Sequence, residues 1–320
     1  KYKVIGIDNN EELVSEINRR YYQPELTVNF YYQTYKQNCK FTTSFKDLGD
    51  ITFVIVPTPS KHNRRFDSSL VDKVLKSIKR KQIVVIISTL MPGETDKLQK
   101  RYPRLSLIYS PTFVALGSVI DDFLRPDFVL VGTESKKSFY ALAEVYRNVL
   151  WKYSFCLMTP IEAEIAKIAI NCYITTKITF ANQIGNICYR LGIPSDKICN
   201  AMGADSRIGG KYLKPGLGYG GPCFPRDNLA FSAFMKSIGI KPVLSQAVDR
   251  LNNLQIKEFI KRIDKAKVET VGFKSLSYKK GSEVTEKSAL KEIYDKLKSK
   301  GKYNVKIGNG DITLDWGGIE

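Results

Sequence analysis

The segment GLGYGGPCFPRD, residues 216–227, holds a cysteine inside a glycine-rich turn. Glycines allow the backbone to approach a ligand closely, and the prolines on both sides of Cys223 restrict the chain around its thiol. Arg226 lies near enough in sequence to favour a thiolate, and Asp227 could orient water or accept a proton. We therefore predict that Cys223 is a nucleophile, and the alternative is an ordinary turn cysteine.

Two polar residues interrupt an apolar run, IAKIAINCYI, at residues 165–174. Lys167 and Asn171 are four apart, so they lie on one face of a helix. A helix that is apolar on nearly every side is buried, and a buried lysine is costly unless it is paired or used. We expect the pair to stabilise an oxyanion, and the alternative is a polar stripe on a surface helix.

Composition narrows the chemistry further. The chain has one histidine, His62, so histidine catalysis and multi-histidine metal sites are close to excluded, and we expect no metal. Its six cysteines show no CxxC spacing and are typical of reduced thiols in a cytoplasmic protein. The net charge of +18 is scattered, which favours a solvated basic surface over nucleic-acid binding and suits phosphate-bearing substrates. We expect no membrane segment and no secretion leader.

The elements that must position these residues alternate between strands and helices. Short β-branched runs predict strands at 3–8, 51–56, 83–88, 105–110 and 128–132. Helical patterns fall between them at 11–20, 68–80 and 136–150. This alternation predicts an α/β domain whose parallel sheet is covered by helices on both faces.

The second half of the chain begins with a different pattern. Pro160 and Gly192 bound one predicted helix of some thirty residues, and a second helical stretch is predicted from 229 to 266. A strand at 268–273, a helix at 287–301 and a strand at 303–308 then form a new βαβ unit. No glycine fingerprint strand precedes the first strand, and one βαβ unit is too little for a domain. We therefore expect both outer domains to lack a segment.

Three residues stand where predicted strands end. In a dinucleotide-binding sheet, an acidic residue such as Asp8 accepts hydrogen bonds from ribose hydroxyls, although it could instead cap the next helix. Thr58, in VPTPS, and Thr89, in STLMPGET, follow two further strands. Ligands bind at the carboxyl ends of parallel strands, so both threonines are candidates, with turn formation as the alternative.

Six segments, in order along almost the whole chain, resemble the nucleotide-sugar dehydrogenases typified by UDP-glucose 6-dehydrogenase. They are VPTPS, STLMPGET, SPTFVALG, EAEIAKIAINCY, DSRIGGKYLKPGLGYGGPCFPRDN and LSYKKGSEVTEKS. The resemblance implies a four-electron oxidation of a UDP-sugar, by default UDP-glucose, with NAD. One hydride leaves C6, Cys223 captures the aldehyde as a thiohemiacetal, a second hydride transfer gives a thioester, and water releases the uronic acid, a polysaccharide precursor.

The resemblance also implies an architecture. Residues 1–157 would form a Rossmann-like NAD-binding domain, residues 158–266 a central helical domain with the catalytic loop, and residues 267–320 the start of a second Rossmann-like domain for the nucleotide sugar. The long central helix is similar to the dimerisation helix of the family, which implies a homodimer.

Individual roles follow from the same resemblance. Lys167 and Asn171 would bind substrate and stabilise oxyanions, Asp227 would assist the thiol or the hydrolytic water, and Thr89 would hold that water. The cofactor-binding positions are Asp8, Thr58, Thr89 and Arg226. The substrate-binding positions are Lys167, Asn171, Tyr212, Gly216, Gly220, Lys279 and Arg207, the last of which would reach the substrate of a neighbouring subunit.

The sequence departs from the family at several positions. The family usually has a glutamate where Thr112 stands, and often an arginine and another glutamate at Ala115 and Leu116. The loop EVTEKS lacks an arginine often found there and holds Glu286. These departures are compatible with a different sugar. Two alternatives stay open: a two-electron hydroxyacid dehydrogenase, which needs no Cys223, and a clipped, non-catalytic relative that binds only a nucleotide or a partner subunit.

Overall fold

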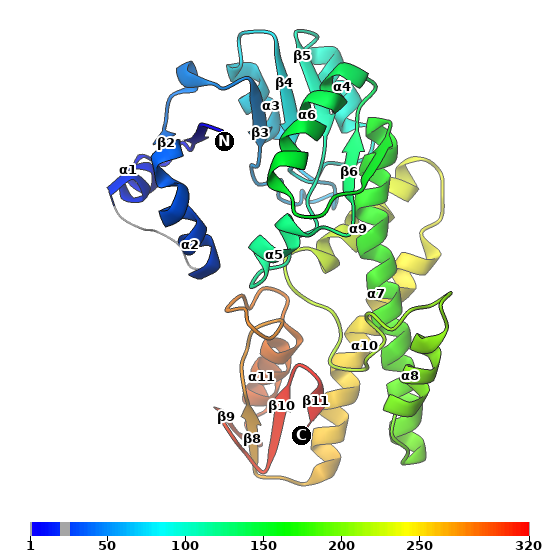
Figure 1. Cartoon of the computed structure of the whole chain (residues 1–320). Coiled ribbons are helices and arrows are strands. Elements are labelled where there is room, and N and C mark those ends of the chain that lie inside the picture. Colours follow the sequence, from blue (N-terminus) through cyan, green and yellow to red (C-terminus); the bar gives the residue numbers. More distant parts are fainter. Residues whose placement is uncertain (1, 20–25, 320) are drawn as a thin grey trace. The chain divides into compact units, whose positions relative to one another are not determined.

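The chain folds into two compact units. The computed structural model describes residues 2–19 and 26–319 (Figure 1). The first unit comprises residues 1–61 and 66–167, and the second comprises residues 62–65 and 168–320. The boundary at 167/168 falls inside the long helix α7 (Pro160–Leu191). The predicted division into three domains stays a prediction.

A five-stranded sheet forms the centre of the first unit. Its strands, in spatial order, are β3 (Ile51–Val54), β4 (Gln82–Ile86), β5 (Leu105–Tyr109), β6 (Val129–Gly132) and β7 (Phe155–Met158). Neighbouring strands are parallel except β5 and β6, which are antiparallel. The predicted parallel sheet is therefore confirmed, apart from this one pair. The connection between β5 and β6 contains only the short helix α5 (Val119–Leu124) and returns the chain in the opposite direction.

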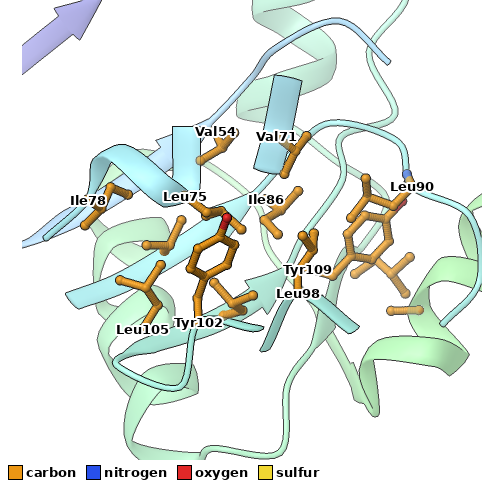
Figure 2. Close-up of a cluster of buried hydrophobic side chains, with 14 residues drawn as sticks. Val54, Val71, Leu75, Ile78, Ile86, Leu90, Leu98, Tyr102, Leu105 and Tyr109 are labelled. Carbon is orange, nitrogen blue, oxygen red and sulfur yellow. Dashed lines mark hydrogen bonds between the residues drawn. The ribbon is translucent and has the colours of Figure 1, made fainter. Parts of the chain in front are cut away.

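Helices cover both faces of this sheet because alternate side chains of each strand point to opposite faces. Val84 and Ile86 belong to a buried cluster with α3 (Ser69–Ser77) and α4 (Glu94–Arg101), of which Figure 2 shows Leu75, Ile86 and Leu98. Val85 belongs to the cluster on the other face, with α6 (Lys136–Val149). The predicted helices at 68–80 and 136–150 are thus confirmed, with α3 ending earlier than expected.

The first predicted strand forms outside the five-stranded sheet. β1 (Val4–Ile7) pairs in parallel with β2 (Cys39–Thr42) in a separate two-stranded sheet. The helices of this region are α1 (Glu11–Arg19), which was predicted, and α2 (Leu26–Tyr35), which was not. Short 3-10 helices at Lys36–Asn38 and Phe45–Asp47 flank β2.

Helices dominate the first part of the second unit. Besides most of α7, they are α8 (Asp196–Ala204), α9 (Phe224–Ser237) and α10 (Val243–Ala266). The prediction of one helical stretch over 229–266 was wrong. Gly239 takes a left-handed φ of 79°, and Pro242, which has no amide hydrogen, stands immediately before α10. The chain therefore breaks between α9 and α10.

A small sheet ends the described chain. Its order is β11 (Gly318–Ile319), β10 (Ile312–Asp315), β8 (Thr270–Phe273) and β9 (Asn304–Ile307). The predicted βαβ unit is confirmed, because β8 and β9 are parallel and α11 (Ala289–Lys300) connects them. Phe273 and Ile293 pack with Phe259 and Ile263 of α10 in one buried cluster. Among the helices that the structure describes, none has the length and apolar character needed to cross a bilayer.

Candidate active site

Amide side chains from two helices hold the glycine-rich loop at residues 216–221. Asn182 of α7 accepts a hydrogen bond from the Gly216 N–H at 2.7 Å, and Gln255 of α10 donates to the Gly216 carbonyl at 2.8 Å. Asn252 of α10 accepts from the Tyr219 N–H at 2.9 Å and donates to the Tyr219 carbonyl at 3.0 Å. Both backbone polar groups of two loop residues are thus paired, which fixes the path of the loop.

These anchors form a regular row on α10 that the sequence analysis missed. Asp249, Asn252 and Gln255 are spaced by three residues, so they lie along one face of the helix. Asp249 accepts hydrogen bonds from the Tyr219 hydroxyl at 2.7 Å and from the Asn228 amide at 2.8 Å. Polar residues at this spacing, with apolar residues such as Leu251, Leu254 and Ile256 between and beside them, were the available signal.

The loop needs glycine because other backbone lies against it. A Cβ at Gly220 would collide with the carbonyl oxygen of Lys287. A Cβ at Gly221 would come within 2.6 Å of the Tyr278 ring, and Gly221 donates its N–H to the Glu286 carbonyl at 3.1 Å. The loop at 216–221 is therefore packed directly against the segment that contains residues 278–287.

Cys223 takes the N-cap position of α9 and is exposed. Its carbonyl accepts the N–H of Asp227 at 2.8 Å, which closes the first turn of the helix. A helix N-terminus carries a partial positive charge, so an anion is stabilised at this position. Tyr278, whose ring covers Gly221, is a near neighbour that sequence reasoning missed: burial and then the charge of Cys223 raise the pKa of its phenol.

Asn171 and Asp227 form a buried polar pair. The Asn171 amide donates to the Asp227 carboxylate at 2.6 Å, and the two residues are 8% and 1% exposed. Arg226 also approaches this carboxylate, with Nε 3.5 Å from Oδ1. Because Asp227 follows Cys223 by four residues on the first turn of α9, the thiol and the carboxylate belong to one face of the helix.

Lys167 stands one turn before Asn171 on α7 and is also buried, at 8% exposure. Its ammonium donates to the Thr112 carbonyl at 2.8 Å and lies 4.1 Å from the centre of the Phe113 ring. The predicted burial of this lysine is confirmed. Leu116, one of the positions at which the sequence departs from the family it resembles, is 42% exposed.

The strand-end residues of the first unit include the Asp8 carboxylate and the Thr58 hydroxyl. The Thr58 hydroxyl donates to the Thr89 carbonyl at 2.8 Å, so the ends of β3 and β4 are linked. Asp8 is exposed at the end of β1 and accepts the N–H of Asn10 at 2.9 Å. Asn10, not Asp8, caps α1 through the Leu13 N–H at 3.0 Å. The Asp8 carboxylate therefore has no capping role and suits ribose hydroxyls.

The remaining predicted residues lie on the second unit. Arg207 is exposed and forms an ion pair with Asp205 at 2.6 Å. Tyr212 is exposed and takes a positive φ of 65°. Lys279 is half-buried, and its carbonyl accepts the Ser277 hydroxyl at 3.0 Å.

A groove of about 480 Å³ runs beside Gly216 in the second unit. Its lining includes Lys214, Gln255 and Arg262, and the Arg262 guanidinium lies 3.9 Å from the centre of the Tyr189 ring. This volume is within the range of small-molecule sites. The groove and the anchored loop therefore share one wall.

Known proteins resemble the chain over most of its length. The family model for the NAD binding domain of the UDP-glucose/GDP-mannose dehydrogenase family matches residues 1–150, and the model for its central domain matches residues 161–254. The UDP-glucose 6-dehydrogenase of Rickettsia bellii is 29% identical over 94% of this chain and 74% of its own length.

A second relative and a solved structure are also similar to the chain over most of its length. UDP-glucose 6-dehydrogenase AglM of Haloferax volcanii is 30% identical over 79% of this chain and 65% of the relative. The solved structure of a UDP-glucose dehydrogenase from Pyrobaculum islandicum superposes with a TM-score of 0.85 at 28% identity, and the match covers 95% of this chain and 76% of that one.

Proposed function

The chain belongs to the UDP-glucose/GDP-mannose dehydrogenase family and is an NAD-dependent nucleotide-sugar dehydrogenase; from this premise we propose that it oxidises C6 of UDP-glucose to the carboxylate through a covalent bond to Cys223. The observation that carries the proposal is the state of Cys223: an exposed thiol at the N-terminus of α9, beside a loop that helices α7 and α10 fix in place.

The thiol supplies the step that an alcohol dehydrogenase lacks. Oxidation of the C6 alcohol gives an aldehyde, and the sulfur of Cys223 adds to its carbonyl carbon to form a thiohemiacetal. Loss of the C6 hydride from this adduct gives a thioester, and water then cleaves the carbon–sulfur bond to release the acid and restore the thiol. Four electrons leave the sugar in total, as two hydrides.

Buried polar groups serve the charges that develop at C6. We assign oxyanion stabilisation to the Lys167 ammonium and the Asn171 amide, because both are held in fixed hydrogen bonds away from bulk water. Asp227, oriented by Asn171, would accept the proton of the thiol or of the hydrolytic water, and Thr89 would hold that water. With Thr112 in place of a glutamate, Asp227 is the carboxylate to which this role falls.

NAD, when bound, supplies the acceptor for both hydrides. The residues that would hold it are Asp8, Thr58, Thr89 and Arg226. The proposal places the enzyme in the cytoplasm, where cysteine thiols stay reduced.

The nucleotide part of the substrate would contact the second unit. Gly216 and Gly220 lie on the anchored loop, and the groove beside Gly216 is large enough for part of a nucleotide sugar. Tyr212, Lys279 and, in a neighbouring subunit, Arg207 complete the proposed substrate contacts.

A homodimer through α7 is part of the same proposal. Tyr173, Phe180 and Ile187 repeat every seven residues along α7 and are 64%, 49% and 54% exposed. Apolar residues at this spacing form one stripe, which a second copy of the helix would cover. Sedimentation of the purified chain decides between a dimer and a monomer.

The amount of NADH formed per UDP-glucose consumed, with NAD+ in excess, tests the proposed reaction. We expect two NADH per sugar for the unchanged chain and at most one for Cys223→Ser, because the serine hydroxyl is a far poorer nucleophile than a thiolate. Cys39→Ser is the matched control, since Cys39 belongs to β2 of the first unit, and this variant should still give two.

The other outcomes identify the alternatives. One NADH per sugar, unaffected by Cys223→Ser, would make the protein a two-electron dehydrogenase. NADH with another UDP-sugar but not with UDP-glucose would correct the substrate, in line with the departures at Thr112 and Leu116. NAD binding without any turnover would favour a non-catalytic relative.

A further inference from the structure

Glu164 is a buried carboxylate that the proposed reaction does not use. It belongs to the first turns of α7, and its side chain is 0% exposed. One carboxylate oxygen accepts the Gly93 N–H at 2.5 Å, and the other accepts the Thr95 N–H and hydroxyl, both at 2.7 Å. Three donors therefore converge on one buried side chain, from a segment some seventy positions earlier in the sequence.

These donors belong to the N-terminus of α4. The N-cap residue is Gly93, which has no side chain with which to cap the helix and takes a left-handed φ of 83°. Glu164 supplies the missing acceptor, and its charge is favourable at the positive end of the helix. The carboxylate thus replaces an N-cap side chain that the local sequence does not provide.

The segment that Glu164 holds, residues 88–95, carries Thr89. Its apolar residues Leu90 and Met91 are buried, and Figure 2 shows Leu90 beside Tyr109. At its start, the Thr89 carbonyl is tied to Thr58. At its end, the attachment to α7 is through Glu164. A change at Glu164 therefore acts on the placement of Thr89.

The other charged groups near Glu164 either have hydrogen-bond partners elsewhere or repel its carboxylate. On α4, Glu94 accepts the Ser68 hydroxyl at 2.6 Å and approaches Lys97 at 3.5 Å, whereas Asp96 acts on Glu164 by repulsion. On α7, Glu162 accepts the Thr159 N–H and hydroxyl, and Lys167 donates to Thr112. Burial raises the pKa of Glu164 to about 7, against the lowering effect of its hydrogen bonds.

We propose that Glu164 is a positioning residue for the dehydrogenase reaction: its carboxylate fixes segment 88–95 and thereby sets the position of Thr89 for NAD and water. The inference rests on the proposed function only for the role of Thr89. Since Lys167 follows Glu164 by three residues, one stretch of α7 holds the loop after β4 with a carboxylate and the loop after β5 with an ammonium.

Glu164→Gln tests the proposal, because glutamine has the same shape but only one acceptor oxygen. Its NH2 group would face either Gly93 N–H or Thr95 N–H, donor against donor. Hydrogen–deuterium exchange reports on these amides directly. We expect their protection to fall roughly tenfold or more, since a bond to a charged group is lost, and the NAD dissociation constant from calorimetry to rise by a similar factor.

Glu162→Gln is the matched control on the same helix, since Glu162 is exposed and bonds only within its own turn. It should leave exchange at Gly93 and Thr95 and NAD affinity unchanged. In the unchanged chain, protection corrected for the intrinsic exchange rate should fall as the pH rises through about 7, because the raised pKa means that the closed state favours protonated Glu164, and Glu164→Gln should abolish this dependence. A purely structural role would lower the melting temperature without a pH-dependent protection step.

Unchanged protection or unchanged NAD affinity in Glu164→Gln would overturn the proposal. If that variant does not fold, Thr95→Val and Thr95→Ser take its place: valine removes one of the three donors and should lower protection, whereas serine keeps it and should restore protection. Neither readout requires turnover. A failure to oxidise UDP-glucose would therefore refute the proposed function and leave the test of Glu164 intact.

Discussion

Two segments that carry proposed site residues are held by different kinds of side chain. Segment 88–95 of the first unit ends in a buried carboxylate, Glu164, which receives three hydrogen bonds. The loop at 216–221 of the second unit is held by neutral amides, among them Asn182 and Asn252. Each arrangement satisfies backbone groups that no local side chain can reach.

The difference between the two segments lies in how they respond to conditions. A buried carboxylate binds its donors strongly but must lose a proton in a dry environment, so its hold depends on pH. An amide pairs with both N–H and C=O at any pH near neutrality. The strength of the charged anchor therefore changes with pH, and burial of its charge costs free energy. The neutral anchors do not change with pH near neutrality.

The largest effect that separates the two anchors is a pH dependence of stability. The pKa of Glu164 rises from its ordinary value of 4.5 to about 7 on folding, so the folded chain favours the protonated form. The stabilisation of the folded chain by protonated Glu164 is complete below pH 4.5 and is lost as the pH rises through 7. Relative to Glu164→Gln, the unfolding free energy of the first unit should fall by about 3 kcal/mol between pH 4.5 and 7.5.

Urea unfolding at each pH measures this dependence. The chain has two tryptophans, Trp151 in the first unit and Trp316 in the second, so a Trp316→Phe background makes fluorescence report on the first unit alone. A constant difference between the two proteins across this pH range would show that Glu164 does not titrate in the folded state.

Gly220→Ala should give the next largest effect, on activity. The new Cβ would collide with the Lys287 carbonyl, and the loop would have to shift away from its anchors. A displacement near 1 Å at a reacting site lowers rates by roughly a hundredfold. Steady-state NADH formation measures this loss. Gly210→Ala is the control, because its Cβ would meet nothing closer than 3.9 Å, and equal activities of the two variants would contradict the packing argument.

Asn252→Leu should have the smallest of the three effects. It leaves the buried N–H and C=O of Tyr219 without partners, and such a loss destabilises a protein by about 2 kcal/mol. Unfolding followed by Trp316 in a Trp151→Phe background should show the same loss at pH 5.5 and pH 7.5. The neighbouring, exposed Asn253→Leu should change little, and a pH-dependent effect of Asn252→Leu would remove the contrast with Glu164.

Much of the fold follows from local sequence signals. The β-branched runs give five of the strands to within two residues, and Pro160 and Gly192 bound α7 almost as the structure has it. The break between α9 and α10 was missed although Gly239 and Pro242 mark it, because apolar residues continue through it. The strand β2 was missed because its run, CKFT, is only four residues long and holds a single β-branched residue.

The candidate site was predicted as a set of residues but not as a network. Burial of Lys167 and Asn171 follows from the apolar helix around them. Their partners do not follow, because a hydrogen bond between α7 and α9 cannot be recognised from the spacing of residues in the sequence. Glu164 stands one position before the apolar run used to predict Lys167, and its partners, Gly93 and Thr95, are distant in sequence. Such pairings arise only when the sheet brings its loops to α7.

The uneven exposure of the cysteines allows one of them to be labelled selectively. Of the six thiols, only Cys223 is exposed, whereas Cys172, Cys188 and Cys199 are buried, and Cys39 and Cys156 are intermediate. A maleimide or iodoacetamide label added briefly should therefore collect at one position, the N-terminus of α9. The chain thus carries a natural attachment point for a fluorophore or spin probe at the centre of its proposed chemistry, without any cysteine having to be removed.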